Sequence, residues 1–226
     1  MPDGSTRLCT PHEFPAAQDR LYLSQGDGRF VDVTDESGIR VPDGKTLGLI
    51  VADFDDSGRL GVFTANDAVP NFLFVNQTER PGDMPRFVES GLTAGVSVDG
   101  EGRAQACMGI AAGDADGDGT IDLFVTNFRN EANTLYLTKG QLDWLDATRS
   151  AGLFAPSFEM LGFGAQMLDA DLDGDEDLLL VNGHVGDLRQ HGVPYAMRPQ
   201  FFENVGKGKF VERRADRAGS FFASEY

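Results

Sequence analysis

Short runs of apolar and aromatic residues alternate along the chain with polar segments rich in Asp, Gly and Asn. Four of these runs resemble one another: RLYLSQ at 20–25, FLFVNQ at 72–77, TLYLTK at 134–139 and FFENVG at 201–206. Runs of this length are too short for ordinary helices, and their branched and aromatic residues favour β-strands. The pattern therefore predicts an all-β fold built from many short strands.

An aspartate-rich segment followed by another apolar run occurs three times between these strands. The copies are ADFDDSGRLGVF at 52–63, AGDADGDGTIDLF at 112–124 and DADLDGDEDLLL at 169–180. Their first aspartates, Asp53, Asp114 and Asp169, are 61 and 55 residues apart. Such a period suits one four-stranded blade of a β-propeller. In each unit we expect strand A before the acidic loop, strand B after it, and then strands C and D.

An aromatic residue followed by a glycine marks the fourth strand of each unit. The pairs that we assign, in chain order, are Phe30 with Gly38, Phe87 with Gly91, Trp144 with Gly152, and Phe210 with Gly219. Their separations are eight, four, eight and nine residues. The aromatic–glycine pair is therefore more variable than the apolar runs and the aspartate-rich segments.

The three elements divide the chain into an array of similar units. We predict an irregular N-terminal segment at 1–19, β-propeller repeats at 20–213 and a C-terminal tail at 214–226. The repeats divide into a half blade at 20–34 and complete blades at about 46–92, 106–150 and 161–213. Neither end resembles the cap that a repeat array needs. We therefore expect about three and a half blades of a larger propeller, with self-association through unclosed blade edges as a second possibility.

The composition agrees with many turns and excludes two classes of partner. The 28 glycines and 10 prolines are about 17% of the 226 residues, above the usual share of roughly 12%. Acids outnumber bases 36 to 19, so the formal charge of −17 repels nucleic acid and anionic membrane surfaces. We see no apolar run long enough for membrane insertion and no signal peptide. With 2 cysteines, a disulfide framework is not expected.

The acidic loops place oxygen ligands at alternate positions, as calcium prefers. We count nine positions from each first aspartate and name the N-terminal loop (53–61), the central loop (114–122) and the C-terminal loop (169–177). The expected ligands of the central loop, at positions 1, 3, 5, 7 and 9, are Asp114, Asp116, Asp118, the carbonyl of Thr120, and Asp122. Gly119 at position 6 permits the sharp turn that this arrangement needs.

The C-terminal loop is equally complete, whereas the N-terminal loop is degenerate. The expected ligands of the C-terminal loop are Asp169, Asp171, Asp173, the carbonyl of Asp175, and Asp177. The N-terminal loop keeps only Asp53, Asp55 and Ser57, with Gly61 where a carboxylate belongs at position 9. We therefore expect two calcium sites and a third of weak or no binding. Magnesium is less apt because it requires strict octahedral coordination.

An EF-hand shares the first positions of this pattern but fails at position 12. Its bidentate glutamate is replaced by Thr64, Val125 and Leu180, and strand-like runs stand where its two helices belong. Ordinary Asp-Gly turns are a further alternative for any single copy. Two complete copies in phase with a repeat favour metal binding, and the metal is expected to tie strand A to strand B.

The order of these elements resembles the FG-GAP or VCBS-type repeats of calcium-binding β-propellers, such as integrin α-chain heads. A closer similarity is to the bacterial ASPIC/UnbV proteins, relatives of cartilage acidic protein. It is carried by TANDAVPNFLFVNQ at 64–77, MGIAAGDADGDGTIDLFVTNF at 108–128 and LGFGAQMLDADLDGDEDLLLVNGHV at 161–185, and covers roughly residues 9–215. The resemblance implies an extracellular, periplasmic or cell-surface propeller of about seven blades without established catalytic residues. The further blades and the C-terminal ASPIC/UnbV segment of that family are lacking here.

Two functional classes remain open at this point. The leading hypothesis is a non-catalytic, calcium-stabilised interaction or adhesion module with a protein or carbohydrate ligand, because we find no catalytic constellation. The alternative is part of a carbohydrate-active enzyme, a polysaccharide lyase or hydrolase. The loop at 184–199 is the richest in basic and aromatic residues and is a candidate partner site. The simpler interpretation is a solvated insertion in which His184 is hydrogen-bonded locally. The recurring asparagines Asn66, Asn76, Asn127 and Asn182 are expected to cap turns.

Overall fold

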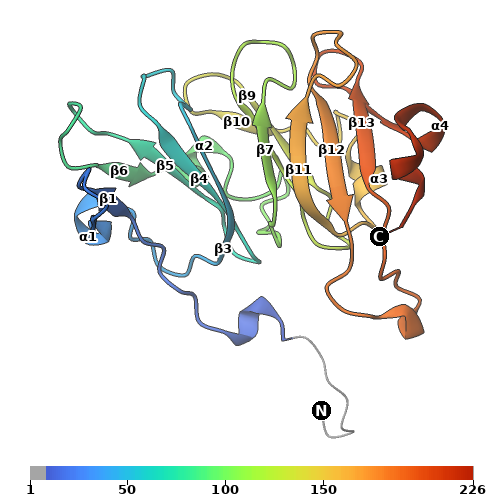
Figure 1. The fold of residues 1–226 in the computed structure, drawn as a ribbon, viewed down its shortest axis with the longest axis horizontal. Helices are drawn as coiled ribbons and strands as arrows, with labels where there is room; N and C mark the ends of the chain where they lie inside the picture. Colours follow the sequence, from blue (N-terminus) through green and yellow to red (C-terminus); the bar gives the residue numbers. More distant parts are fainter. Residues whose placement is uncertain (1–8, 226) are drawn as a thin grey trace, which may run out of the picture.

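The structure, a computed structural model, describes residues 9–225 and is all-β. Its strands form one two-stranded and three four-stranded antiparallel sheets, and only short helices accompany them (Figure 1). This confirms the all-β prediction. None of the helices among the described residues could cross a membrane. Residues 1–8 of the predicted N-terminal segment and residue 226 of the tail lie outside the described residues.

The sheets follow one another along the chain, and each pairs its strands in chain order. The two-stranded sheet is β1 (Tyr22–Ser24) and β2 (Phe30–Asp32), and the next is β3 (Thr46–Ala52), β4 (Gly61–Asn66), β5 (Phe72–Asn76) and β6 (Phe87–Glu89). The third is β7 (Ile110–Gly113), β8 (Asp122–Val125), β9 (Thr134–Thr138) and β10 (Trp144–Asp146). The last is β11 (Gly162–Leu168), β12 (Asp177–Asn182), β13 (Gln200–Asn204) and β14 (Phe210–Arg213).

Short helices occupy the connections and both ends of the array. They are η1 (Pro11–Glu13), α1 (Thr34–Ser37), α2 (Gly91–Ala94), α3 (Phe154–Ser157), η2 (Arg189–His191), α4 (Ala215–Ala218) and η3 (Ser220–Ala223). The tail, expected to carry no cap, forms α4 and η3, and the Phe222 ring lies 5.7 Å from that of Phe201 on β13. It therefore packs on the last sheet.

The first strands of the four-stranded sheets, β3, β7 and β11, are neighbours (Figure 1). The apolar core lies between consecutive sheets rather than within one sandwich. Phe74 on β5, Tyr136 on β9 and Phe202 on β13 stand at matching places in their sheets and are almost completely buried. Burial of these rings against the neighbouring sheet is the main source of cohesion between the units.

A glycine after the last strand of three sheets sets the distance to the next sheet. Gly38, Gly95 and Gly152 all have left-handed φ angles. A Cβ on them would lie 2.4, 2.3 and 2.8 Å from the carbonyl oxygens of Phe87, Trp144 and Phe210 of the following sheet. The pairing of Phe87 with Gly91 was therefore wrong: Gly95, eight residues after Phe87, has this role, and the eight-residue spacing holds in all three units.

The recurring asparagines cap turns as expected. Asn66 accepts a hydrogen bond from the Lys45 backbone N–H at 3.0 Å and donates to the Pro70 carbonyl at 2.7 Å. Asn127 donates to the Ala132 carbonyl at 2.7 Å in the corresponding turn. These side chains replace backbone partners where the chain leaves the sheet. Both cysteines, Cys9 and Cys107, are free.

Candidate functional site

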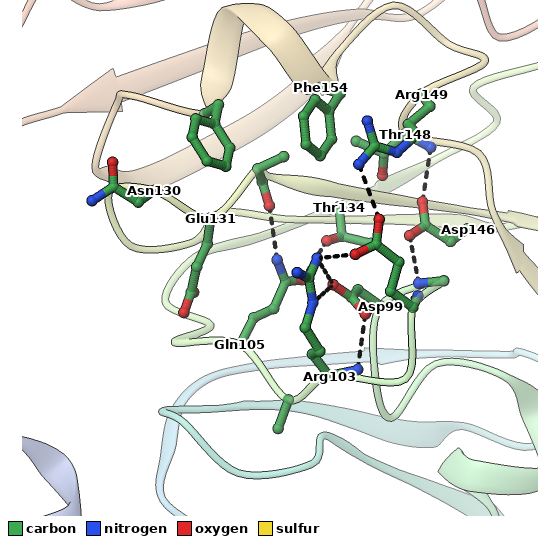
Figure 2. Close-up of a pocket in the computed structure, with 15 residues that line it drawn as sticks. Asp99, Arg103, Gln105, Asn130, Glu131, Thr134, Asp146, Thr148, Arg149 and Phe154 are labelled. Atoms are coloured by element: carbon green, nitrogen blue, oxygen red, sulfur yellow. Dashed lines mark hydrogen bonds and ion pairs between the residues drawn. The ribbon is translucent and has the colours of Figure 1, made fainter.

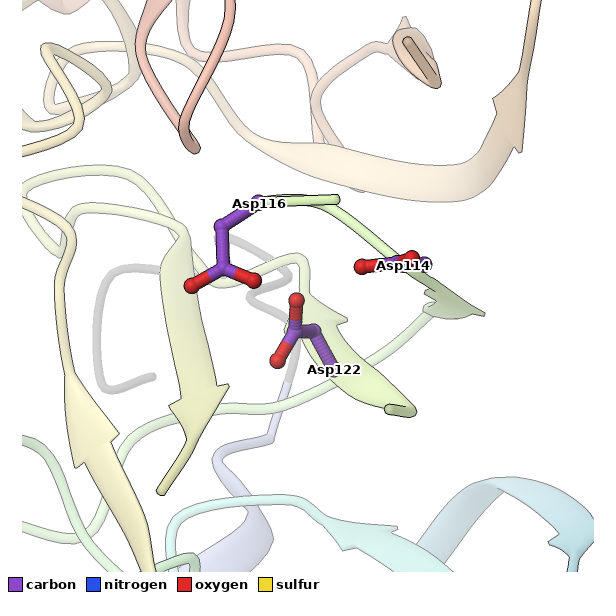
Figure 3. A group of neighbouring side chains, drawn as sticks. All are labelled: Asp114, Asp116 and Asp122. Atoms are coloured by element: carbon purple, nitrogen blue, oxygen red, sulfur yellow. The ribbon is translucent and has the colours of Figure 1, made fainter. Parts of the chain in front are cut away.

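The central loop brings three aspartates together between β7 and β8 (Figure 3). Asp114, Asp116 and Asp122 each offer a carboxylate oxygen, and these oxygens all lie within 4.8 Å of one another. The loop closes on Asp114, whose two oxygens accept the backbone N–H groups of Asp118 and Gly119 at 2.9 and 2.8 Å. Positive φ angles at Gly117 and Gly119 make this tight turn possible.

The electrostatics of the central loop favour a cation. The Oδ1 atom of Asp116 is buried and has no hydrogen-bond partner among the described residues. Burial raises the pKa of the Asp116 carboxyl, and the Asp118 and Asp114 carboxylates raise it further. Burial also raises the pKa of Asp122 to about 6, against the opposing effect of two backbone N–H donors. A cation within this group would relieve both the repulsion and the unsatisfied oxygen.

Asp118, also expected as a ligand, lies outside this group of three. Its Oδ1 atom accepts the backbone N–H of Thr120 at 2.9 Å and the Thr120 hydroxyl. These hydrogen bonds, from the side chain first, lower the pKa of Asp118. The exposed carboxylate is thus held by the loop itself, and joining the other three requires its side chain to turn.

The C-terminal loop forms a second group from Asp169, Asp171 and Asp173. Asp169 accepts the backbone N–H groups of Asp173 and Gly174, both at 3.1 Å, which repeats the closure of the central loop. Asp177 lies outside this group, although the equivalent Asp122 lies inside its own. The two loops therefore share a backbone shape but present different subsets of the four expected carboxylates.

The position 9 carboxylates also join strands. Asp122 is fully buried, and its two oxygens accept the backbone N–H groups of Ala115 at 2.9 Å and Thr138 at 2.7 Å. Asp177 accepts in the same way from Ala170 at 3.2 Å and Asn204 at 2.8 Å. Each carboxylate therefore connects the start of its loop to the third strand of its sheet. The sequence predicted these two residues as metal ligands and did not predict this structural role.

The N-terminal loop keeps the shape without the ligands. Asp53 accepts the N–H groups of Ser57 and Gly58 at 3.1 and 2.7 Å, and Asp55 accepts that of Ser57 at 3.3 Å. At position 9, a Cβ on Gly61 would lie 3.1 Å from the ring of Phe54, which stands where the other loops have alanine. The ring occupies the space of the missing carboxylate, so this loop offers two aspartates and a serine.

Two groups of three aspartates can therefore hold a metal ion. Their donor atoms are carboxylate oxygens, which suit hard divalent cations, and neither group contains a histidine or cysteine of the kind that zinc prefers. The buried Oδ1 of Asp116, which has no hydrogen-bond partner in the described part of the chain, is the observation that points most directly to a ligand. The residues present thus fit a hard cation.

A pocket of about 430 Å³ lies at the other end of the third sheet (Figure 2). The central loop joins β7 to β8, so the antiparallel return of β8 puts residues 126–133 at the opposite end. The pocket is lined by this connection, by residues 99–105 and by the segment around α3. Hydrogen bonds fix its walls: the Asn130 N–H donates to the Phe158 carbonyl at 2.8 Å, and the Gln105 amide donates to that of Ala132 at 3.1 Å.

Most charged groups of the pocket are paired with one another. Two guanidinium nitrogens of Arg103 donate to one oxygen of Asp99, Oδ2, at 2.9 and 2.8 Å, and Arg103 forms an ion pair with Glu101 at 2.8 Å. Arg149 pairs with Glu101 at 3.0 Å and stacks over the ring of Phe154 at 3.5 Å (Figure 2). These contacts build the wall and leave little charge for a ligand.

Three groups of the pocket remain available. Glu131 makes no ion pair with any described residue; its Oε2 atom accepts the Ala106 N–H at 2.9 Å, and burial raises the pKa of its carboxyl. Asn130 is exposed, and no side-chain hydrogen bond holds it within residues 9–225. Phe158 is 37% exposed and stacks on Phe154 with 5.5 Å between ring centroids. A carboxylate, an amide and an aromatic ring together suit a polar ligand with an apolar face.

The loop at 184–199 offers less than its composition suggested. His184 is hydrogen-bonded locally to Gly186, as expected for a solvated insertion, and its ring contacts that of Phe128. Arg189 pairs with Asp187 at 2.6 Å, and Arg198 pairs with Glu212 at 2.6 Å. Tyr195 remains 46% exposed. Both arginines of the loop are thus neutralised by neighbouring carboxylates.

No family model matches this chain, and a search of curated proteins finds no similar one.

Proposed function

We propose that the protein is a non-catalytic, calcium-binding β-propeller module of the FG-GAP/VCBS type, closest to the ASPIC/UnbV proteins. The observation that carries this proposal is the pair of aspartate groups in equivalent loops of two successive sheets, one of them with a buried oxygen that has no hydrogen-bond partner within residues 9–225. Structural calcium in this position would offset part of the negative charge of the loops and hold the first two strands of each sheet together.

The propeller arrangement is supported by the regular step between sheets. The same glycine contact joins each sheet to the next at Gly38, Gly95 and Gly152, and the first strands β3, β7 and β11 lie together. A constant step of this kind is typical of radial repeats. At the end of the array, Gly219 has a positive φ angle, and a Cβ on it would meet no atom of residues 9–225 within 4 Å. It is placed to meet a further sheet or a second copy of the chain.

Calcium is favoured over magnesium because the carboxylates are irregularly arranged and several of them, among them Asp114, Asp122 and Asp169, also accept backbone N–H groups. Calcium sites of extracellular modules bind with dissociation constants of about 0.1–1 mM, and we expect the two loops to fall in this range. An extracellular, periplasmic or cell-surface location would supply such concentrations, which agrees with the location implied by the family resemblance.

Isothermal titration calorimetry of the chelator-treated chain tests the metal assignment. Calcium is expected to bind at two sites per chain, and magnesium at least about tenfold more weakly at the same sites. Terbium luminescence provides an independent readout, because energy transfer from an aromatic residue requires the ion to be bound nearby. A chain that binds neither calcium nor terbium would refute the proposal.

We further propose that the pocket at Glu131 and Phe158 receives the ligand of the module, a carbohydrate or a protein. Replacing Phe158 by Ala should weaken ligand binding about fivefold to tenfold, because the exposed ring is lost. Phe163→Ala is the matched control, since Phe163 is 39% exposed but does not line the pocket. A polysaccharide panel measured for saturable binding, with and without calcium, checks this prediction.

The same panel separates the module from a carbohydrate-active enzyme. Saturable binding without turnover supports the module, whereas release of new reducing ends or unsaturated products supports the enzyme. A hydrolase needs two free carboxyl groups flanking the bond. In the pocket, Asp99 and Glu101 are already paired with arginine and Asp146 accepts two backbone N–H groups, which leaves Glu131 alone. The geometry therefore favours binding over hydrolysis.

A further inference from the structure

One side chain of the C-terminal loop reaches into the central loop. Glu176 stands at position 8 of its own loop, yet its Oε2 atom accepts the backbone N–H of Asp114 at 2.8 Å. A Cβ on Gly113 would lie 1.9 Å from that oxygen, so the glycine leaves the room that this approach needs. Glu176 is therefore part of the C-terminal loop in sequence, but its side chain binds the first expected ligand residue of the central loop.

Asn204, at the end of β13, connects the same two loops. Its backbone N–H donates to Asp177 at 2.8 Å, and its side-chain amide donates to the carbonyl oxygens of Ala115 at 2.9 Å and Glu176 at 3.0 Å. The side chain is buried. Asn204 thus holds position 9 of the C-terminal loop and position 2 of the central loop at once.

The turn after Asn204 lies against the central loop as well. A Cβ on Gly208 would be 3.2 Å from the Cβ of Asp116. Asp116 carries the buried Oδ1 atom without a partner among the described residues. The turn therefore helps to bury the one carboxylate whose chemistry points most directly to a cation.

This bridging is specific to one pair of loops. The residues equivalent to Asn204 are Thr138 and Asn76. Their side chains donate to the position 8 carbonyls of their own loops, those of Ile121 and Leu60. Within residues 9–225, neither side chain has a hydrogen bond to a neighbouring acidic loop. The N-terminal loop is therefore outside the coupled unit.

We propose that the central and C-terminal loops bind calcium cooperatively, with Glu176 and Asn204 as the positioning residues that couple them; this rests on the calcium binding proposed for the two loops. A cation in the central loop must immobilise Asp114, and a cation in the C-terminal loop must order the turn that carries Asp169, Asp171 and Asp173. The hydrogen bonds of Glu176 and Asn204 then pass that order to the other loop. The second ion then meets a loop that is already ordered, so the coupling is positive. By linkage it is equal in both directions.

Calorimetric calcium titrations of the full chain and of loop-disabled variants test the coupling. Asp169→Asn with Asp171→Asn disables the C-terminal loop and is expected to weaken binding at the central loop about tenfold. Asp114→Asn with Asp116→Asn disables the central loop and isolates the C-terminal one. Glu176→Ala removes the acceptor of the Asp114 N–H and should weaken the central site as well. Disabling the C-terminal loop in that variant should then have a much smaller effect on the central site, because only Asn204 still joins the two loops.

Two further variants separate positioning from general damage to the fold. Glu176→Gln keeps an acceptor oxygen for the Asp114 N–H and is expected to retain the coupling. Glu159→Ala, an exposed glutamate outside both loops, should change neither affinity. With the central loop disabled, the C-terminal site should bind calcium equally well with and without the Glu176→Ala substitution, which a merely destabilised chain would not show.

The outcomes distinguish this inference from the assignment beneath it. Absence of calcium binding at both loops would overturn the proposed function itself. If both loops bind calcium but the affinity of the central loop is the same with and without a functional C-terminal loop, the coupling alone would be overturned. Weakening of the isolated C-terminal site by Glu176→Ala would also contradict it, because the positioning role places the direct effect of this side chain on the central loop.

Discussion

Replacing Asp116 and Asp171 by Asn is expected to abolish most of the calcium-dependent stabilisation while leaving the metal-free protein as stable as before. These two carboxylates stand at position 3 of their loops and have few contacts within the fold. The Oδ1 atom of Asp116 has no partner among the described residues, and Asp171 accepts only one long hydrogen bond, from the Asp173 N–H at 3.3 Å. An uncharged side chain there removes repulsion without removing a support of the fold.

The size of the effect follows from mass action. Calcium at about a hundred times its dissociation constant stabilises the folded state by about 2.7 kcal/mol per independent site. For a chain of this length, each kcal/mol shifts the unfolding midpoint by about 2–4 °C. Two sites should therefore raise the midpoint of the unaltered protein by on the order of 10–20 °C. Cooperative binding changes how this gain is divided between the sites.

Thermal unfolding followed by circular dichroism, with calcium and with chelator, measures both quantities. The matched control is Asp55→Asn in the N-terminal loop, where Gly61 and the Phe54 ring leave no carboxylate at position 9. That control should keep the full calcium response. If the Asp116 and Asp171 variant still responded to calcium like the unaltered chain, the two groups of aspartates would not be the binding sites.

Much of this architecture could be predicted because each unit repeats the same local signals. The strands were found from their apolar runs and the acidic loops from alternate aspartates at a constant phase. Gly95, the glycine that follows Phe87 at the regular spacing, was missed because its role is to let the backbones of two neighbouring sheets approach each other. Gly91 is nearer in sequence, but only the contact of Gly95 with the Trp144 carbonyl reveals the spacing.

The sequence indicates which aspartates lie in each loop but not the direction of their side chains. Alternation identifies which aspartates line a turn, yet nearby backbone donors decide where each carboxylate points. Thr120 therefore draws Asp118 away from its group, and Asn204 holds Asp177. The pocket at Glu131 and Phe158 had no signal in the sequence, since it is assembled from three connections that share no motif. Such a site becomes visible only when the sheets are packed together.

Asp122→Asn is expected to destabilise the protein with and without calcium, in contrast to the position 3 variants. Both oxygens of Asp122 accept backbone N–H groups, from Ala115 and Thr138. Asparagine can accept only one of these hydrogen bonds, and its amide group would face the other N–H as a second donor. Leaving a buried donor unsatisfied costs about 1–3 kcal/mol, and the loss of a charged acceptor adds to it.

Urea unfolding in chelator and in calcium resolves the two roles of this residue. In chelator, Asp122→Asn should lose about 2–4 kcal/mol, whereas the exposed Asp118→Asn should lose less than about 1 kcal/mol. In calcium, both variants should lose stabilisation in addition, because each removes a ligand candidate of the central loop. An Asp122→Asn protein as stable in chelator as the unaltered chain would show that position 9 serves the metal alone. The expected loss in chelator would show instead that the carboxylate joins the loop to β9 before any ion binds, so that the fold itself prepares the site.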